Sequence, residues 1–332
     1  MDAPDRTGNL DAVTARKARA DLETHGLSLL PPKSSSLIER TVTIPILTAY
    51  SPNAKIIHLA APTASPRPLI VLFYSGGFSV GTIHQLTEPA RTFAQRFNAV
   101  VVLGEYRMVP EVRWPVPWKD VWELLEYLSR HANGSKFGHA ELDLSKGGGF
   151  VVGGISAGAS IATACAEIDA LGLAEREGVT ALASRITGLM SNVPFLVVPD
   201  ILPQQFRSIW TAWKEMEHVA GFNTKALQQV IEGIQCTDYH SCWFSPVTEL
   251  ASSKEVLKCH PRVYVSACQR DPLRDDGKVF CALLQQRGVE AKMDIFPDDG
   301  HNGWSVIPWP RNSTNPSFEE AYLAGMEWLL HR

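Results

Sequence analysis

The sequence predicts an α/β protein with a mostly parallel central sheet that is flanked by helices on both faces. Several short runs are continuously apolar, which is typical of strands buried on both faces of a sheet. Helix-like segments alternate with these runs, and such alternation favours parallel strands joined by helices. The 332 residues include 45% hydrophobic and 20% charged side chains, enough to build a large core. We expect a single domain over residues 1–332.

The N-terminal part precedes the alternation. Residues 11–25 combine charged residues with helix formers and predict an amphipathic helix. The segment Pro31–Ser36 then interrupts the chain. Strand-like runs follow at 40–47 and 55–60, and a proline-containing turn at 61–68 leads into the alternating part.

Buried strands and helices then follow one another along the chain. The strands are expected at 69–73, 99–103, 150–154, about 186–190, 262–267 and 291–296. The helices are expected at 86–97, 118–131, about 157–171, 275–287 and 317–330.

One region breaks this rhythm. Residues 200–245 are helical in character and too long for a simple connection, so we interpret them as a cap inserted in the core fold and joined by residues 1–36. The aromatic side chains of this region either line an apolar substrate pocket or pack the cap on the core: Trp210, Trp213 and Phe222. Their helical spacing favours packing, and the pocket remains the alternative.

Composition and the lack of certain motifs argue against several classes of protein. The formal net charge of −4 disfavours a nucleic-acid binder. No run of 18 apolar residues predicts a membrane span, and the N-terminal residues lack the apolar core of a signal peptide, so we expect a cytoplasmic protein. The six cysteines form no CxxC pair, which leaves a zinc site without support. The sequence is compatible with a homodimer but does not fix the oligomeric state.

The segment Gly154–Gly158 has the pattern G-x-S-x-G between a buried strand and a helix. A sharp strand-to-helix turn strains the backbone at the serine and leaves room only for small neighbours. The turn lifts the serine hydroxyl above the sheet, at a helix N-terminus that favours a developing oxyanion. We therefore predict that Ser156 is a nucleophile, with an inert serine in a tight turn as the alternative.

A glycine-rich loop, Tyr74–Phe78, follows the strand at 69–73. Backbone N–H groups in such a loop can point at a ligand. In an acyl-transfer enzyme they would bind the oxyanion together with the N–H that follows the nucleophile. The predicted donors are Gly76, Gly77 and Ala157, and a plain turn is the alternative.

A carboxylate and a histidine follow two later strands. Asp271 comes after the strand at 262–267, where it can orient a histidine and stabilise its charged form. His301 lies in a glycine-flanked segment after the strand at 291–296 and can reach Ser156 as a general base. The chain order Ser156, Asp271, His301 matches the α/β-hydrolase arrangement. Asp275 and Asp276 are expected to begin the next helix.

Four motifs in order resemble the hormone-sensitive-lipase-like branch of the α/β-hydrolase superfamily, which includes many fungal and microbial esterases. Residues 74–78 stand where the family has HGGGF, residues 105–111 look like DYRLAPE, residues 154–158 like GDSAG, and residues 271–277 like DPLRDEG. The resemblance covers about residues 65–330. It implies an α/β-hydrolase fold with a helical cap and the same catalytic and oxyanion-hole residues.

Three positions depart from the family pattern. Tyr74 replaces the family histidine, Ser75 replaces the first glycine, and Ile155 replaces the acidic residue before the nucleophile. These changes suggest a different support for the loop and a more apolar pocket floor. We therefore expect Tyr74, Ser75, Phe78 and Ile155 to line the substrate pocket, and Trp210 and Trp213 would join them under the pocket alternative.

The leading functional hypothesis is a serine hydrolase that cleaves a carboxylic ester, thioester or lactone in a small apolar substrate. It needs no cofactor and no metal. A second hypothesis is a biosynthetic enzyme of the same fold, such as a cyclase, acyltransferase or C–C lyase, because one fold hosts several chemistries. A third is a non-catalytic protein that binds a small molecule, as the plant gibberellin receptors of this branch do.

Overall fold

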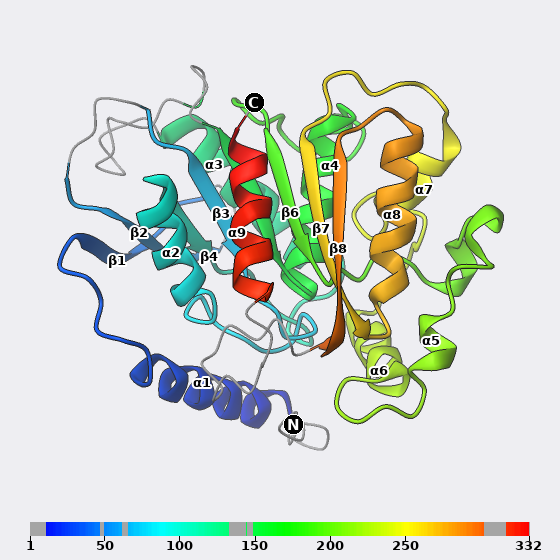
Figure 1. Cartoon of the computed structure of the whole chain (residues 1–332), viewed down its shortest axis with the longest axis horizontal. Helices are drawn as coiled ribbons and strands as arrows, with labels where there is room; N and C mark the ends of the chain where they lie inside the picture. Colours follow the sequence, from blue (N-terminus) through cyan, green and yellow to red (C-terminus); the bar gives the residue numbers. More distant parts are fainter. Residues whose placement is uncertain are drawn as a thin grey trace.

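The computed structural model describes residues 11–46, 50–61, 66–132, 144, 149–301 and 317–331. Its centre is an eight-stranded sheet with the strand order β1-β2-β4-β3-β5-β6-β7-β8 (Figure 1). The strands are β1 (Leu37–Thr43), β2 (Asn53–Leu59), β3 (Leu69–Phe73), β4 (Val100–Gly104), β5 (Phe150–Ile155), β6 (Gly188–Asn192), β7 (Arg262–Arg270) and β8 (Ala291–Gly300). β2 pairs antiparallel with β1 and β4, and the strands from β4 to β8 pair in parallel. The predicted fold class is confirmed.

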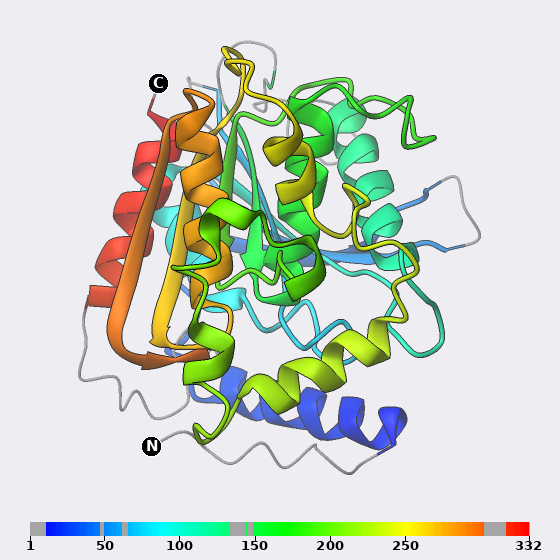
Figure 2. The same cartoon turned by 90° about the vertical axis from the view of Figure 1, so that its right-hand side faces the viewer.

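Helices cover both faces of this sheet. One face carries α2 (Thr87–Phe97) and α9 (Ser317–Leu330). The other carries α3 (Val116–His131), α4 (Ala157–Ala170), α7 (Pro246–Ser252) and α8 (Arg274–Gln286). Figure 2 shows α9 (red) on one side of the strands and α8 (orange) on the other. Both faces of the parallel strands are therefore buried, which explains their continuously apolar sequences.

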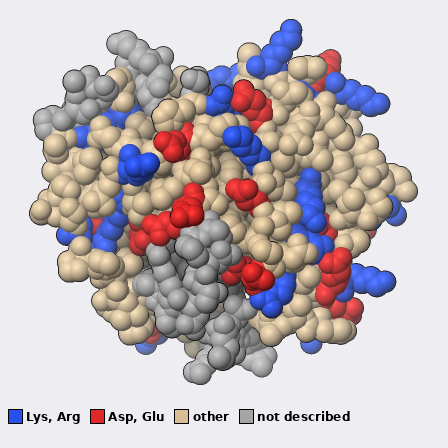
Figure 3. Space-filling view, viewed as in Figure 1, with Lys and Arg blue, Asp and Glu red and all other residues tan. Residues whose placement is uncertain are grey.

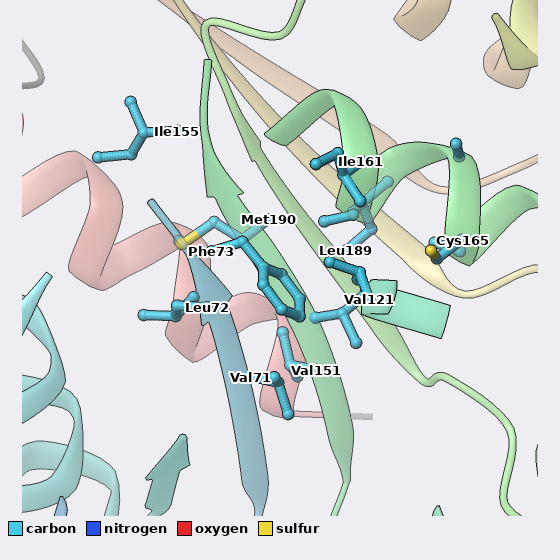
Figure 4. Close-up of a cluster of buried hydrophobic side chains, with 14 of the residues drawn as sticks. Val71, Leu72, Phe73, Val121, Val151, Ile155, Ile161, Cys165, Leu189 and Met190 are labelled. Atoms are coloured by element: carbon cyan, nitrogen blue, oxygen red, sulfur yellow. The ribbon is translucent and has the colours of Figure 1, made fainter. Parts of the chain in front are cut away.

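The core has two halves because side chains alternate along each strand. Figure 4 shows Phe73 and Leu189 on one face, near Val121 of α3 and Ile161 of α4. Leu72 points to the opposite face, toward α2 and α9. All five side chains are buried.

The boundaries of β1 and β8 differ from the predictions. β1 begins at Leu37 and ends at Thr43, whereas the expected run was 40–47. β8 continues beyond the expected end at 296 to Gly300, through Pro297. Because β8 is an edge strand, Pro297 can occupy it without removing a hydrogen bond from the interior of the sheet. The extension carries the chain toward the carboxyl ends of the neighbouring strands.

Further helices lie at the carboxyl ends of the parallel strands. The inserted segment, residues 200–245, contains α5 (Ala212–Glu215) and α6 (Thr224–Ile234), and two short turns of 3₁₀ helix, Pro199–Ile201 and Gln204–Phe206, lie at its start. Figures 1 and 2 place α6 and the N-terminal helix α1 (Ala12–Ser28) along this same end of the sheet.

Polar contacts attach α1 to the core. Arg16 donates to the carbonyl of Ser79 at 2.7 Å and pairs with Glu111, and the Thr82 hydroxyl donates to the buried Glu23.

The surface in Figure 3 carries acidic and basic side chains interspersed, and the described residues on that face form no extended basic area. Among the helices within the described ranges, none combines the length and the apolar character that a bilayer span needs.

Candidate active site

Ser156 lies in the turn between β5 and α4, with φ 53° and ψ −118°. A Cβ atom at Gly154 would lie 2.6 Å from the carbonyl oxygen of Phe73, and one at Gly158 would lie 2.2 Å from it. Both positions therefore need glycine for the turn to approach β3 this closely. The Ser156 N–H donates to the carbonyl of Asn192 at 2.9 Å, which fixes the strained serine in place.

The structure brings the three predicted catalytic side chains together. The distance from His301 Nε2 to Ser156 Oγ is 2.9 Å, and the distance from His301 Nδ1 to Asp271 Oδ2 is 2.8 Å. Asp271 is fully buried, and its second oxygen, Oδ1, accepts a hydrogen bond from the N–H of Leu273 at 2.9 Å. The carboxylate is thus fixed at both oxygens, and one of them faces the imidazole.

The glycine-rich loop after β3 contains two glycines with positive φ. Gly76 and Gly77 have φ values of 130° and 56°, and a Cβ at Gly76 would lie 2.0 Å from the carbonyl oxygen of Val80. Among the described residues, no hydrogen-bond acceptor engages the N–H groups of Gly76, Gly77 or Ala157. These three donors lie in the turns that follow β3 and β5, two neighbouring strands, and are available to bind an oxyanion.

Tyr74 and Phe78 support this loop from within the core, which corrects their predicted place in the substrate pocket. The Tyr74 ring stacks on Tyr106 at 4.5 Å, and each hydroxyl donates to the carbonyl of the other residue. Phe78 stacks on Trp118 at 4.7 Å. Tyr74 is 2% exposed and Phe78 is 1% exposed, so neither presents a surface to substrate.

Ser75 is held by Gln85, a residue that no sequence motif singled out. The N–H of Ser75 donates to Gln85 Oε1 at 2.7 Å, and Gln85 Nε2 donates to Ser75 Oγ at 3.0 Å. Gln85 is itself buried. The amide of Gln85 therefore provides the altered loop support that the Tyr74-Ser75 replacement suggested.

Ile155 faces away from Ser156, which corrects its predicted place in the pocket floor. It lines a small cavity of about 20 Å³ with Phe93 of α2 and Tyr322 of α9. Leu72 and Met190, on the two neighbouring strands, line the same cavity. Strand alternation therefore directs Ile155 to the α2 and α9 face of the sheet.

Trp210 and Trp213 pack on each other with ring centroids 5.0 Å apart, and Trp210 Nε1 donates to Asp276 Oδ1 at 2.8 Å. These contacts favour the packing interpretation of the two tryptophans. The aromatic contact with His301 comes from Phe222 instead, at a centroid distance of 4.2 Å.

Asp276 and Asp275 begin α8, as predicted, and also attach the inserted segment to the core. Asp276 Oδ2 accepts the N–H groups of Leu196 and Val197 at 2.8 and 3.0 Å. Burial raises the pKa of Asp276 to about 8, against the lowering effect of its N–H donors.

Asp275 holds the inserted segment by hydrogen bonds and forms ion pairs within α8. Its Oδ2 accepts the N–H groups of Thr211 and Ala212 at 2.8 and 2.7 Å, and its Oδ1 pairs with Arg274 and Lys278. Burial would raise the pKa of Asp275, but these hydrogen bonds outweigh it and lower the pKa to about 2.

We expect Asp275→Asn to destabilise the fold by about 3 kcal/mol at pH 7, because it removes one partner from a buried ion pair. The folded-state pKa lies below the unfolded value of 3.8, so the contribution is complete above about pH 5 and is lost progressively as the pH falls through about 2. Urea unfolding of both proteins between pH 7 and pH 3 should therefore show a stability difference that shrinks in acid. A difference that is independent of pH would contradict this assignment.

Within the described ranges, no group of three or more His, Cys, Asp or Glu side chains is arranged to hold a metal ion.

A strained serine turn above a mostly parallel sheet, with a histidine and a buried carboxylate after later strands, defines an α/β hydrolase. The comparisons with known proteins agree. A family model described as alpha/beta hydrolase fold matches residues 70–305, and the chain belongs to this family. The predicted family and fold are confirmed.

Two relatives and one solved structure illustrate the similarity. Versiconal hemiacetal acetate esterase from Dothistroma septosporum is 26% identical over 80% of this chain and 74% of its own length. Carboxylesterase NlhH from Mycobacterium tuberculosis is also 26% identical, with the same coverage of both chains. The crystal structure of vibralactone cyclase superposes with a TM-score of 0.80 at 22% identity, over 99% of this chain and 92% of that one.

Proposed function

We propose that this protein is a serine hydrolase that cleaves a carboxylic ester through an acyl-enzyme. The observation that carries the proposal is the continuous chain of hydrogen bonds from Asp271 through His301 to Ser156, at 2.8 and 2.9 Å. An imidazole in this position can accept the serine proton, and a buried carboxylate can hold the imidazole in the required tautomer.

The proposed reaction uses these side chains and water. His301 removes the proton of Ser156 as Oγ attacks the ester carbonyl, and the N–H groups of Gly76, Gly77 and Ala157 bind the tetrahedral oxyanion. His301 then returns the proton to the leaving alcohol. Water, activated by His301, hydrolyses the acyl-enzyme and restores the free serine.

The proposed substrate is a small apolar ester. Phe222 lies against the imidazole, and a Cβ atom at Gly77 would lie 2.9 Å from Val230 Cγ2, so apolar side chains of the inserted segment border both parts of the site. The similarity to the two esterases named above supports an ester as the substrate class.

Labelling with a fluorophosphonate probe tests the proposal directly, because such probes react with activated serines. Wild type should gain a single adduct by intact mass, and Ser156→Ala should gain none. Ser252→Ala changes an exposed serine on α7 and serves as the matched control that keeps the adduct. A wild-type protein that forms no adduct would contradict the proposal and favour the non-catalytic binding alternative.

A second candidate is transfer of the acyl group to an alcohol of the same substrate, which forms a lactone. The observation in its favour is the altered loop after β3, where Gln85 holds Ser75 and Tyr74 pairs with Tyr106, because one fold hosts several chemistries. Mass analysis of the products separates the two reactions. Hydrolysis adds the mass of one water to the substrate fragments, whereas lactone formation adds none.

A further inference from the structure

The inserted segment places an aromatic ring on the face of the proposed catalytic base. The rings of Phe222 and His301 stack with centroids 4.2 Å apart and planes 29° apart. The two nitrogen edges of the same imidazole are occupied by Asp271 and Ser156. Within the described residues, His301 is therefore held by contacts in its own plane and by the Phe222 ring on its face.

The backbone around Phe222 is fixed by local hydrogen bonds. The next residue, Asn223, caps α6 by accepting the N–H of Ala226 at 3.0 Å, and it donates to the carbonyl of Val219 at 3.2 Å. Thr224 then donates from its hydroxyl to the carbonyl of Trp213 at 2.5 Å. The ring of Phe222 thus projects from a turn that is held by hydrogen bonds to the preceding segment and to α6.

The helix that follows Phe222 also reaches the oxyanion loop. Val230 lies so close to Gly77 that a Cβ there would come within 2.9 Å of Val230 Cγ2. At the end of α6, the carbonyl of Ile234 accepts the N–H of Trp114 at 3.2 Å. The segment from Phe222 to Ile234 therefore contacts both the base and the loop of the predicted oxyanion donors.

We propose that Phe222 is a positioning residue for His301, an inference that rests on the proposed function. When Ser156 attacks the substrate, the imidazole becomes a cation, and an aromatic face next to a cation stabilises it. The same ring blocks rotation of the imidazole out of the plane of its two hydrogen bonds and excludes water from that face. The inserted segment thereby completes the catalytic base.

Three variants test this role. Phe222→Leu keeps an apolar side chain but removes the aromatic face, and Phe222→Tyr keeps the ring. Phe206→Leu makes the same exchange at a buried phenylalanine elsewhere in the inserted segment and controls for altered packing. For each variant we would measure kcat and KM with p-nitrophenyl acetate and p-nitrophenyl butyrate, and the melting temperature.

We expect Phe222→Leu to lower kcat by about 5- to 30-fold, with KM within about twofold of wild type. Phe222→Tyr should keep kcat within about threefold of wild type, and Phe206→Leu should lower only the melting temperature. A loss confined to KM would overturn the proposal, because Phe222 would then affect only substrate binding and not the catalytic base. Equal losses in the Leu and Tyr variants would overturn it too, because the aromatic face would then not matter.

Proton NMR keeps this test separate from the proposed function, because it needs no turnover. The proton between His301 Nδ1 and Asp271 should give a low-field signal that is absent in His301→Gln. We expect the signal to weaken in Phe222→Leu, where the imidazole can rotate and exchange with water, and to persist in Phe222→Tyr. An unchanged signal in Phe222→Leu would overturn the positioning role even if wild type hydrolyses no ester.

Discussion

Replacing Ser156 by alanine should lower kcat for ester hydrolysis by about ten-thousand- to a million-fold. The variant has no atom that can form the acyl-enzyme, so only binding and the oxyanion donors remain to assist water. The expected measurement is kcat and kcat/KM with p-nitrophenyl acetate, at enzyme concentrations high enough to detect slow turnover.

The loss should come from chemistry and not from unfolding. The side chain of Ser156 bonds only to His301 among the described residues, and the backbone bonds of residue 156 do not depend on the hydroxyl. We therefore expect a melting temperature within a few degrees of wild type. A variant that is fully folded and retains more than a hundredth of the wild-type kcat would show that another group is the nucleophile.

The sequence was sufficient to predict a feature of the site where that feature depends on local backbone geometry. Gly154 and Gly158 flank Ser156 because the turn must approach β3 within a distance that no side chain allows. The sequence was also sufficient to predict the grouping of Ser156, Asp271 and His301, which is not local, since each follows a strand of one parallel sheet. Parallel strands bring their carboxyl ends to one edge, so strand-end residues far apart in sequence are placed together.

The sequence was not sufficient to predict side-chain contacts that depend on packing between distant segments. A tyrosine in a glycine-rich loop gave no sign that Tyr74 would pair with Tyr106, or that Gln85 would hold Ser75. The contact of Phe222 with His301 likewise depends on how the inserted segment lies over the sheet. Helical spacing alone could not separate Phe222 from Trp210, whose indole bonds to Asp276.

Ile155 is a different case, because the alternation of side chains along the predicted strand already indicates which face of the sheet it occupies. Side chains of β5 alternate between the two faces, and this alternation places Ile155 with Leu72 and Met190 on the α2 and α9 face. Its apolar character follows from that buried position. The acidic residue of the family pattern is therefore replaced here without any change to a surface that substrate would touch.

Replacing Asp271 by asparagine should lower kcat by about a thousand- to ten-thousand-fold while the fold is retained. Asparagine has the same shape as aspartate and can keep the hydrogen bond from the N–H of Leu273 to its Oδ1. Activity with p-nitrophenyl acetate, together with the melting temperature, measures the effect. The matched control is Asp294→Asn on β8, where the carboxylate accepts from the Tyr264 hydroxyl and the same exchange should leave kcat near wild type.

The physical reason is that the side chain of residue 271 determines which nitrogen of His301 carries the proton. The Leu273 N–H requires an acceptor at Oδ1, so the amide oxygen of the asparagine must remain there and its NH₂ group must take the place of Oδ2. That NH₂ group would donate to His301 Nδ1, and a neutral imidazole would then carry its own proton on Nε2. A protonated Nε2 cannot accept the proton of Ser156. A variant with near wild-type kcat would therefore mean that Asp271 does not set the tautomer of His301, whatever the distance between them.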